Sequence, residues 1–229
     1  MEPSRSYKNG SREKKMVLEK MDPGLDGRLK GMVSASFFET AEALKKLPLR
    51  GGGFILGAAF LIADSIKAGG KLMLCGNGGS AADCQHMAAE FVCRLTGERE
   101  RPALPALALT TDSSFLTAFC NDYCFEDVFV RQVQALGRPG DVLMGISTSG
   151  SSENIKRAVR AAKKMEVKTI ALTRRGGAIG ELADVAIEID SEKTAVIQNV
   201  HLAVEHALCQ IVEELIFGET PASPGGDLP

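Results

Sequence analysis

Five hydroxyl side chains crowd one short stretch of the chain, which reads Gly145-Ile146-Ser147-Thr148-Ser149-Gly150-Ser151-Ser152-Glu153. The stretch follows an apolar run and precedes an amphipathic segment, so it is predicted to end a strand and begin a helix. Hydroxyl groups and the free amides of a helix N-terminus together bind a phosphate without a lysine. A helix cap at Ser152 alone would need one hydroxyl. We therefore interpret this serine loop as a phosphate-monoester site, with an elaborate cap as the alternative.

A second candidate lies earlier in the chain, where Cys75-Gly76-Asn77-Gly78-Gly79-Ser80 follows another apolar run. Glycines allow backbone amides to approach a ligand closely, and a helix is predicted to begin at Ser80. The spacing matches neither the dinucleotide pattern GxGxxG nor the nucleotide-triphosphate pattern GxxxxGK[ST]. A tight turn without a ligand is the alternative for this glycine turn.

All three histidines lie on two predicted helices. His86 is followed four residues later by Glu90, so an imidazole and a carboxylate share one helix face. The last helix carries Gln198, His201 and His206. At about 100° per residue, Gln198 and His206 lie about 80° apart around the axis and reach one broad face, but periodicity does not decide between His201 and His206. Each of these residues also has a purely structural interpretation.

The elements that must position these residues alternate between short apolar runs and amphipathic segments, which is typical of a parallel sheet built from βαβ units. We predict an α/β fold with a doubly wound, mainly parallel five-stranded sheet, helices on both faces and additional N-terminal helices. The ligand crevice is expected at the carboxyl ends of the strands. The predicted strands are Lys71–Cys75, Ala106–Thr110, Asp141–Ile146, Thr169–Thr173 and Val185–Ile189. The predicted helices between and after them are Ser80–Leu95, Ser114–Cys120, Asp127–Leu136, Ser152–Met165, Ile179–Leu182 and Thr194–Phe217.

The two ends of the chain differ in composition from this core. Residues 1–24 are polar and charged, and they are predicted to be a flexible extension. Residues 25–218 are predicted to form a single domain that opens with a helical hairpin, Gly27–Lys46 and Phe54–Lys67, broken at Pro48 and the following glycines. Residues 219–229 are predicted to be a flexible tail.

The overall composition narrows the class of protein. The chain has 229 residues, of which 45% are apolar and 24% charged, with a formal net charge of −2. This balance gives no basic field for binding nucleic acid. Because no apolar run reaches the roughly 18 residues of a membrane span, we expect a cytoplasmic protein that contacts neither membrane nor nucleic acid. The six cysteines have no CxxC spacing and are expected to be reduced.

Taken together, these motifs resemble the phosphoheptose isomerases, which are sedoheptulose 7-phosphate isomerases of the SIS (sugar isomerase) fold. The resemblance runs from about Asp64 to Leu215. It implies an aldose-ketose isomerase that converts sedoheptulose 7-phosphate to D-glycero-D-manno-heptose 7-phosphate through an enediol. In that family the reaction is the first step of heptose precursor synthesis for lipopolysaccharide or other surface glycans. The features that carry the resemblance are the glycine turn, the His86-x-x-x-Glu90 pair, Asn121-Asp122, the serine loop and Gln198 to His206.

The resemblance also implies roles for individual residues. Glu90 and His206 match the catalytic base and acid, and a zinc ion is implied at His86, Glu90, Gln198 and His206. The family further implies a homotetramer with active sites shared between subunits. The residues implied in substrate binding are Asn77, Gly78, Gly79, Glu90, Asn121, Asp122, Ser147, Thr148, Ser149, Ser152 and Gln198.

One departure and two alternatives accompany this resemblance. After Ser80 the chain reads Ala81-Ala82-Asp83, where some isomerases carry a histidine directly after the serine. The same alanine pair is a feature of non-catalytic SIS proteins, which form tetramers and bind a bacterial replication initiator. Those proteins lack a glutamate at the position of Glu90. A SIS protein that acts on or senses a different sugar phosphate is the second alternative.

Overall fold

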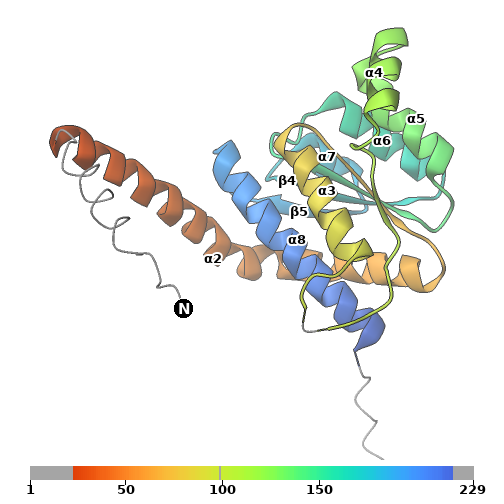
Figure 1. The fold of residues 1–229 in the computed structure, drawn as a ribbon, viewed down its shortest axis with the longest axis horizontal. Helices are drawn as coiled ribbons and strands as arrows, with labels where there is room; N and C mark the ends of the chain where they lie inside the picture. Colours follow the sequence, from red (N-terminus) through yellow and green to blue (C-terminus); the bar gives the residue numbers. More distant parts are fainter. Residues whose placement is uncertain (1–22, 98, 219–229) are drawn as a thin grey trace, which may run out of the picture. The chain divides into compact units, whose positions relative to one another are not determined.

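The computed structural model describes residues 23–97 and 99–218 (Figure 1). It divides into two compact units, residues 1–41 and 42–229. Within the first unit the described residues form the N-terminal part of helix α2 (Pro23–Lys67). Met32, Phe37 and Phe38 of this part are exposed. The predicted extension at residues 1–24 and tail at 219–229 lie almost wholly outside the described residues, but Pro23 and Gly24 are helical.

The N-terminal helices differ from the prediction. Instead of two separate helices, the chain forms one helical element, α2, with a bend between Leu47 and Gly51. Pro48 has no amide hydrogen, so one intrahelical hydrogen bond is lost at this place, and the following glycines accept the distorted backbone. The breaking residues therefore bend the helix without ending it.

The second unit contains the predicted doubly wound sheet. All strand pairs are parallel, and the spatial order is β2-β1-β3-β4-β5. β1 and β3 are buried along their whole length, as expected for strands covered on both faces. The strands are β1 (Leu72–Gly76), β2 (Ala106–Ala108), β3 (Val142–Ser147), β4 (Lys168–Arg174) and β5 (Val185–Ile189).

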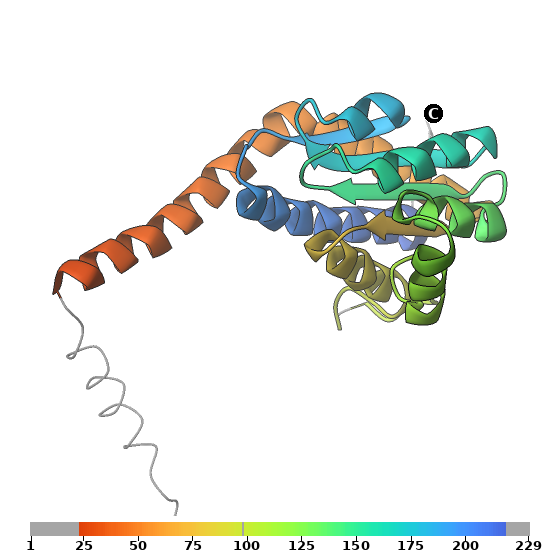
Figure 2. The same cartoon turned by 90° about the horizontal axis from the view of Figure 1, so that it is seen from above.

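Helices cover both faces of this sheet, and each face has its own core (Figures 1 and 2). Leu72 and Leu74 of β1 point to the face covered by α3, α8 and the C-terminal part of α2, whereas Met73 and Cys75 point to the face covered by α5, α6 and α7. Burial of these apolar side chains is the main force that holds the helices to the sheet. The remaining helices are α3 (Gly79–Val92), α4 (Ser113–Asp122), η1 (Phe125–Asp127), α5 (Val128–Leu136), α6 (Glu153–Lys164), α7 (Ala178–Leu182) and α8 (Thr194–Phe217).

Within the described residues, no single helix is long and apolar enough to cross a bilayer. The two segments of the bent helix α2 reach that threshold only when they are counted together.

Candidate active site

The strand order places the two predicted ligand loops next to each other. The sheet reverses its direction of growth between β1 and β3, and ligands of doubly wound sheets bind at such a switch point, beyond the carboxyl ends of the strands. Gly76 at the end of β1 is aligned with Ile146 near the end of β3. The glycine turn after β1 and the serine loop after β3 therefore open from neighbouring strands at the switch point.

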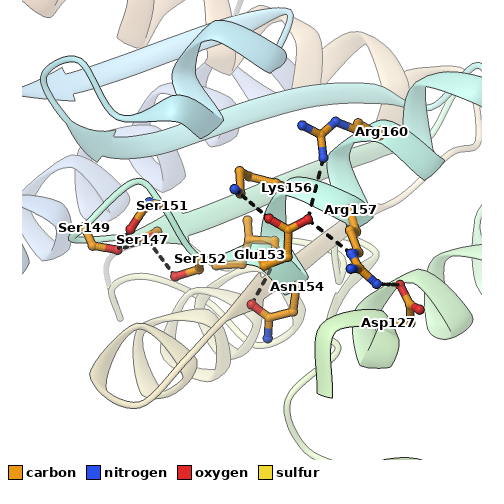
Figure 3. A network of polar contacts seen from close by, with 11 residues as sticks. Asp127, Ser147, Ser149, Ser151, Ser152, Glu153, Asn154, Lys156, Arg157 and Arg160 are labelled. Carbon is orange, nitrogen blue, oxygen red and sulfur yellow. Dashed lines mark hydrogen bonds and ion pairs between the residues drawn. The ribbon is translucent and has the colours of Figure 1, made fainter. Parts of the chain in front are cut away.

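The hydroxyl groups of the serine loop face one another (Figure 3). The Oγ atom of Ser147 lies 3.3 Å from that of Ser149 and 3.1 Å from that of Ser152, and it accepts a hydrogen bond from the amide of Gly150. Ser152 occupies the N-cap position of α6, but its side chain makes no capping hydrogen bond. The loop is therefore more than a helix cap, because its hydroxyls are gathered at the N-terminus of a twelve-residue helix.

Gly150 allows this loop to close. Its φ angle is +66°, and a Cβ atom there would lie 2.4 Å from the Cα atom of Gly177. A side chain at this position would thus require both a strained backbone and displacement of a neighbouring chain segment.

A pair of asparagines joins the two loops. Nδ2 of Asn77 in the glycine turn donates to Oδ1 of Asn154 at 2.9 Å, and Nδ2 of Asn154 donates to Oδ1 of Asn77 at 2.8 Å. Asn154 is buried in the first turn of α6. This reciprocal contact fixes the distance between the glycine turn and the helix that carries the serine loop.

Helix α8 reaches the same place through Gln198. A Cβ atom on Gly79 would lie 2.2 Å from Nε2 of Gln198, so the amide of Gln198 packs directly on the glycine turn. Nε2 of Gln198 donates to Oδ2 of Asp83 on α3 at 3.1 Å. Burial raises the pKa of Asp83, and the hydrogen bond from Gln198 and the nearby His86 act in the opposite direction.

The predicted catalytic pair lies where α3 and α8 face each other, which we call the α3–α8 seam. Nε2 of His86 is 2.9 Å from Nε2 of His206, and the rings meet edge to face. Oε1 of Glu90 is 3.9 Å from Nε2 of His86. Oε2 of Glu90 is buried and has no hydrogen-bond partner among the described residues. An imidazole and a carboxylate of α3 thus lie in one row with an imidazole of α8.

Two further titratable side chains of α8 are buried. Glu205 is 0% exposed, and burial together with the carboxylate of Asp83 raises its pKa to about 8. His201 is also 0% exposed, and burial lowers its pKa to about 4, against an opposing effect of the Thr173 backbone. Neither carboxylate oxygen of Glu205 has a hydrogen-bond partner within the part of the chain that is described. His201 and His206 therefore have opposite environments, one sealed and one exposed.

Not all of the predicted site residues meet in one place. Asn121 and Asp122 lie at the exposed end of α4, where Nδ2 of Asn121 donates to Oδ1 of Asp122 at 2.8 Å. The glycine turn, the serine loop and Gln198 converge at the switch point, and His86, Glu90 and His206 lie in the seam. The roles that the sequence assigned to these residues remain predictions.

Three of the four predicted zinc ligands, His86, Glu90 and His206, lie in the seam, whereas Gln198 contacts Gly79 and Asp83. Across residues 23–97 and 99–218, no group of three histidine, cysteine, aspartate or glutamate side chains is arranged to hold a metal ion. The donor set nevertheless fits zinc chemically, since imidazole nitrogens and a carboxylate are its usual ligands. Oε2 of Glu90, which has no hydrogen-bond partner in the described chain, is available as a metal ligand.

Sequence reasoning missed Asp83 and Asn154. Asp83 precedes His86 by three residues and Glu90 by seven, so its helical spacing placed it on the same face of α3, and that signal was available. Asn154 carried no such signal, because its partner Asn77 is 77 positions away in the chain.

Known proteins similar to this chain belong to one domain family. The profile of the SIS domain family matches residues 37–174. The phosphoheptose isomerase of Solidesulfovibrio magneticus is 55% identical over 160 residues, which cover 70% of this chain and 78% of that protein. That of Thiobacillus denitrificans is 48% identical over 198 residues, which cover 85% of this chain and 98% of that protein.

A solved structure agrees with these relatives. Phosphoheptose isomerase GmhA from Neisseria gonorrhoeae superimposes with a TM-score of 0.76 and 43% identity, covering 81% of this chain and 99% of that chain. The chain belongs to the SIS domain family and, within it, to the phosphoheptose isomerases. The fold and the family expected from the sequence are thus confirmed.

Proposed function

We propose that this protein is an aldose-ketose isomerase that converts sedoheptulose 7-phosphate to D-glycero-D-manno-heptose 7-phosphate. The proposal is supported by two features, a loop of facing hydroxyls at a helix N-terminus and a carboxylate–imidazole row, in a chain 55% and 48% identical to two phosphoheptose isomerases. A sugar phosphate fits this layout, since one end of it is an anion and the other end exchanges protons. We further propose that the product serves lipopolysaccharide or other surface-glycan synthesis.

The proposed reaction moves two protons and leaves the oxidation state of the molecule unchanged. Glu90 removes a proton from C1 of the ketose while His206 gives a proton to the carbonyl oxygen at C2, and a 1,2-enediol forms. A proton then returns to C2 and the hydroxyl proton at C1 is removed, which leaves an aldehyde at C1. A carboxylate base and an imidazole acid suit this exchange near neutral pH.

The remaining residues hold the sugar phosphate during this exchange. Hydroxyl groups of the serine loop and the N-terminus of α6 bind the phosphate. We assign this role to Ser147, Thr148, Ser149 and Ser152. The residues proposed to hold the sugar and its hydroxyls are Asn77, Gly78, Gly79, Asn121, Asp122 and Gln198.

We propose a zinc ion as cofactor, held by His86, Glu90, Gln198 and His206. The support is chemical: these are zinc-binding side chains, His86 and His206 are in contact, and one oxygen of Glu90 is buried without a partner in the described chain. When bound, such an ion polarises oxygen atoms of a substrate.

We also propose a cytoplasmic homotetramer with sites shared between subunits. Exposed phenylalanines on α2 support self-association: Phe54 and Phe60 in one compact unit are 55% and 50% exposed, and Phe37 in the other is 73% exposed. Large apolar side chains gathered on a surface are typical of interfaces. Light scattering of the purified protein tests this assembly.

The test of the proposed function is turnover of sedoheptulose 7-phosphate by the purified protein, followed as formation of aldose phosphate. We expect turnover that is lost after chelation and restored by Zn²⁺. Absence of turnover with every divalent metal tried would contradict the proposal and favour a non-catalytic SIS protein. Turnover that survives complete chelation would support the isomerase activity and contradict the proposed zinc cofactor.

A further inference from the structure

The loop that follows α3 returns a buried arginine to the end of that helix. Arg101 is 9% exposed, and its Nη2 atom donates to the carbonyl of Glu90 at 2.7 Å while Nη1 donates to the carbonyl of Phe91 at 2.8 Å. Carbonyls in the last turn of a helix lack intrahelical partners. Arg101 therefore caps the C-terminus of the helix that carries the proposed base, at the backbone of the base itself.

The same guanidinium is joined to α8 by a buried ion pair. Nε of Arg101 donates to Oε1 of Glu213 at 2.6 Å, and the two side chains are 2% and 10% exposed. Glu213 lies seven residues beyond His206, which is about two helical turns, so both project from the same side of α8. One arginine side chain thus connects the two helices that carry Glu90 and His206.

Stability alone does not explain this pair. Removing two charges from water costs free energy that their attraction repays only in part, and apolar residues of similar volume often give equal stability. The pair instead fixes the orientation of the groups that it binds. A planar guanidinium has donors at fixed angles, and here they hold Glu213 and the carbonyls of Glu90, Phe91 and Pro102 at once.

The side chain of Glu90 has little support of its own. Its Oε2 atom has no hydrogen-bond partner among the described residues, and its Oε1 atom is 3.9 Å from His86. The place of this carboxylate is therefore set by the helix backbone, which Arg101 holds.

We propose that Arg101 and Glu213 are a positioning pair that sets the distance between Glu90 on α3 and His206 on α8 for proton transfer. The inference rests on the proposed isomerase function. The pair acts through the two helices, and neither residue is proposed to touch the substrate.

The test replaces both partners together, so that no buried charge is left alone. The double variant Arg101→Met/Glu213→Leu removes the positioning pair. Arg99→Met/Glu214→Leu is the matched control, because Arg99 and Glu214 form a neighbouring pair from the same loop and helix at 2.9 Å, with side chains 40% and 65% exposed. Circular dichroism establishes that both variants are folded.

We expect the Arg101→Met/Glu213→Leu variant to lose at least tenfold in kcat while KM for sedoheptulose 7-phosphate changes less than threefold. KM is spared because the serine loop is held by its own contacts and by the Asn77–Asn154 pair. The control variant should keep both constants within twofold. Amide hydrogen exchange of the peptide containing Glu90 should also be faster in the positioning-pair variant than in the control.

Three outcomes separate this inference from the proposed function. A folded positioning-pair variant with wild-type kcat overturns the inference and leaves the isomerase standing. Wild-type protein without turnover overturns the proposed function, and the inference falls with it even if hydrogen exchange responds. If the double variant does not fold, Arg101→Lys, which keeps the charge beside Glu213 but loses the planar fork of donors, replaces it, and an unchanged kcat in that variant overturns the inference.

Discussion

The serine loop and the α3–α8 seam, the two parts of the proposed site, are built in opposite ways. In the loop, neighbours in the sequence bond to each other, and the hydroxyl of Ser147 contacts those of Ser149 and Ser152. In the seam, His86 and His206 meet across 120 positions of the chain, and buried oxygens of Glu90 and Glu205 have no partner among the described residues. The hydroxyls of the loop bond to one another, whereas carboxylate oxygens of the seam are acceptors without a partner in the described chain.

This difference agrees with the proposed division of roles, in which the loop binds the phosphate and the seam transfers protons. Buried polar atoms without partners are costly, and a fold keeps them mainly where a ligand or a reaction uses them. We therefore expect substitutions in the seam to lower kcat and substitutions in the loop to raise KM.

The largest effect is expected from Glu90→Gln in the seam. The amide keeps the size of the side chain but cannot accept a proton, so kcat should fall by about 100- to 10,000-fold, the usual contribution of a general base. Steady-state kinetics measure this, with circular dichroism as the test of folding. Glu126→Gln, an exposed glutamate of η1, is the control and should keep full activity. Full activity in the Glu90→Gln variant would contradict the proposed mechanism.

A change in the loop should give the opposite signature. Ser149→Ala removes one hydroxyl from the phosphate site, and a hydrogen bond to a charged group contributes about 1.5–3 kcal/mol, so KM should rise by at least about tenfold with a smaller change in kcat. Thr117→Ala is the matched control, because the Thr117 hydroxyl donates to the carbonyl of Ser113 within α4. Equal KM values for the two variants would mean that the serine loop does not bind the phosphate.

Gly79→Ala tests the place where the two parts meet. The added methyl group would lie 2.2 Å from Nε2 of Gln198, so this amide must move while the backbone stays in place. We expect roughly tenfold lower kcat/KM, about 1.4 kcal/mol in the transition state, and little loss of stability. Gly57→Ala on α2 is the control, since a Cβ there meets nothing within 4 Å. Wild-type kinetics in Gly79→Ala would show that the position of Gln198 does not matter.

The last prediction concerns stability in acid and leaves catalysis unchanged. The pKa of His201 is about 4 in the folded chain and near 6.5 when unfolded, so between these values the unfolded state binds more protons. Stability from this source is fully present above pH 6.5 and falls as the pH drops toward 4, by about 1.4 kcal/mol per unit at most. His201→Leu should weaken this acid dependence in urea titrations at pH 7 and pH 5. An identical pH dependence in the variant would mean that His201 does not titrate on unfolding.

The sequence predicted the sheet and both loops because their signals are local. Apolar runs such as Val142–Ser147 bury both faces, and glycine or serine clusters follow them directly. The family then followed from the short motifs and their order along the chain, whereas the spatial order of the strands was not predicted. Helix boundaries were predicted to within a few residues, apart from the bent α2.

What escaped prediction depends on packing between distant segments. The contact of Asn77 with Asn154 and the return of Arg101 to the end of α3 have no periodic signal in the sequence. The sequence also did not decide which of His201 and His206 belongs to the site, because helical spacing gives an angle around the axis but not the depth of burial. The structure separates these two histidines only because α8 packs against the sheet through one side.

The most direct test of the account is to follow sedoheptulose 7-phosphate by NMR in D₂O with wild-type protein and with Glu90→Gln. We predict that the wild-type protein forms the aldose phosphate and introduces solvent deuterium at C2, and that Glu90→Gln binds the sugar phosphate but forms no product at a comparable rate. No conversion by the metal-supplied wild-type protein, or equal conversion by Glu90→Gln, would contradict the claim that this site is a proton-transferring isomerase centre.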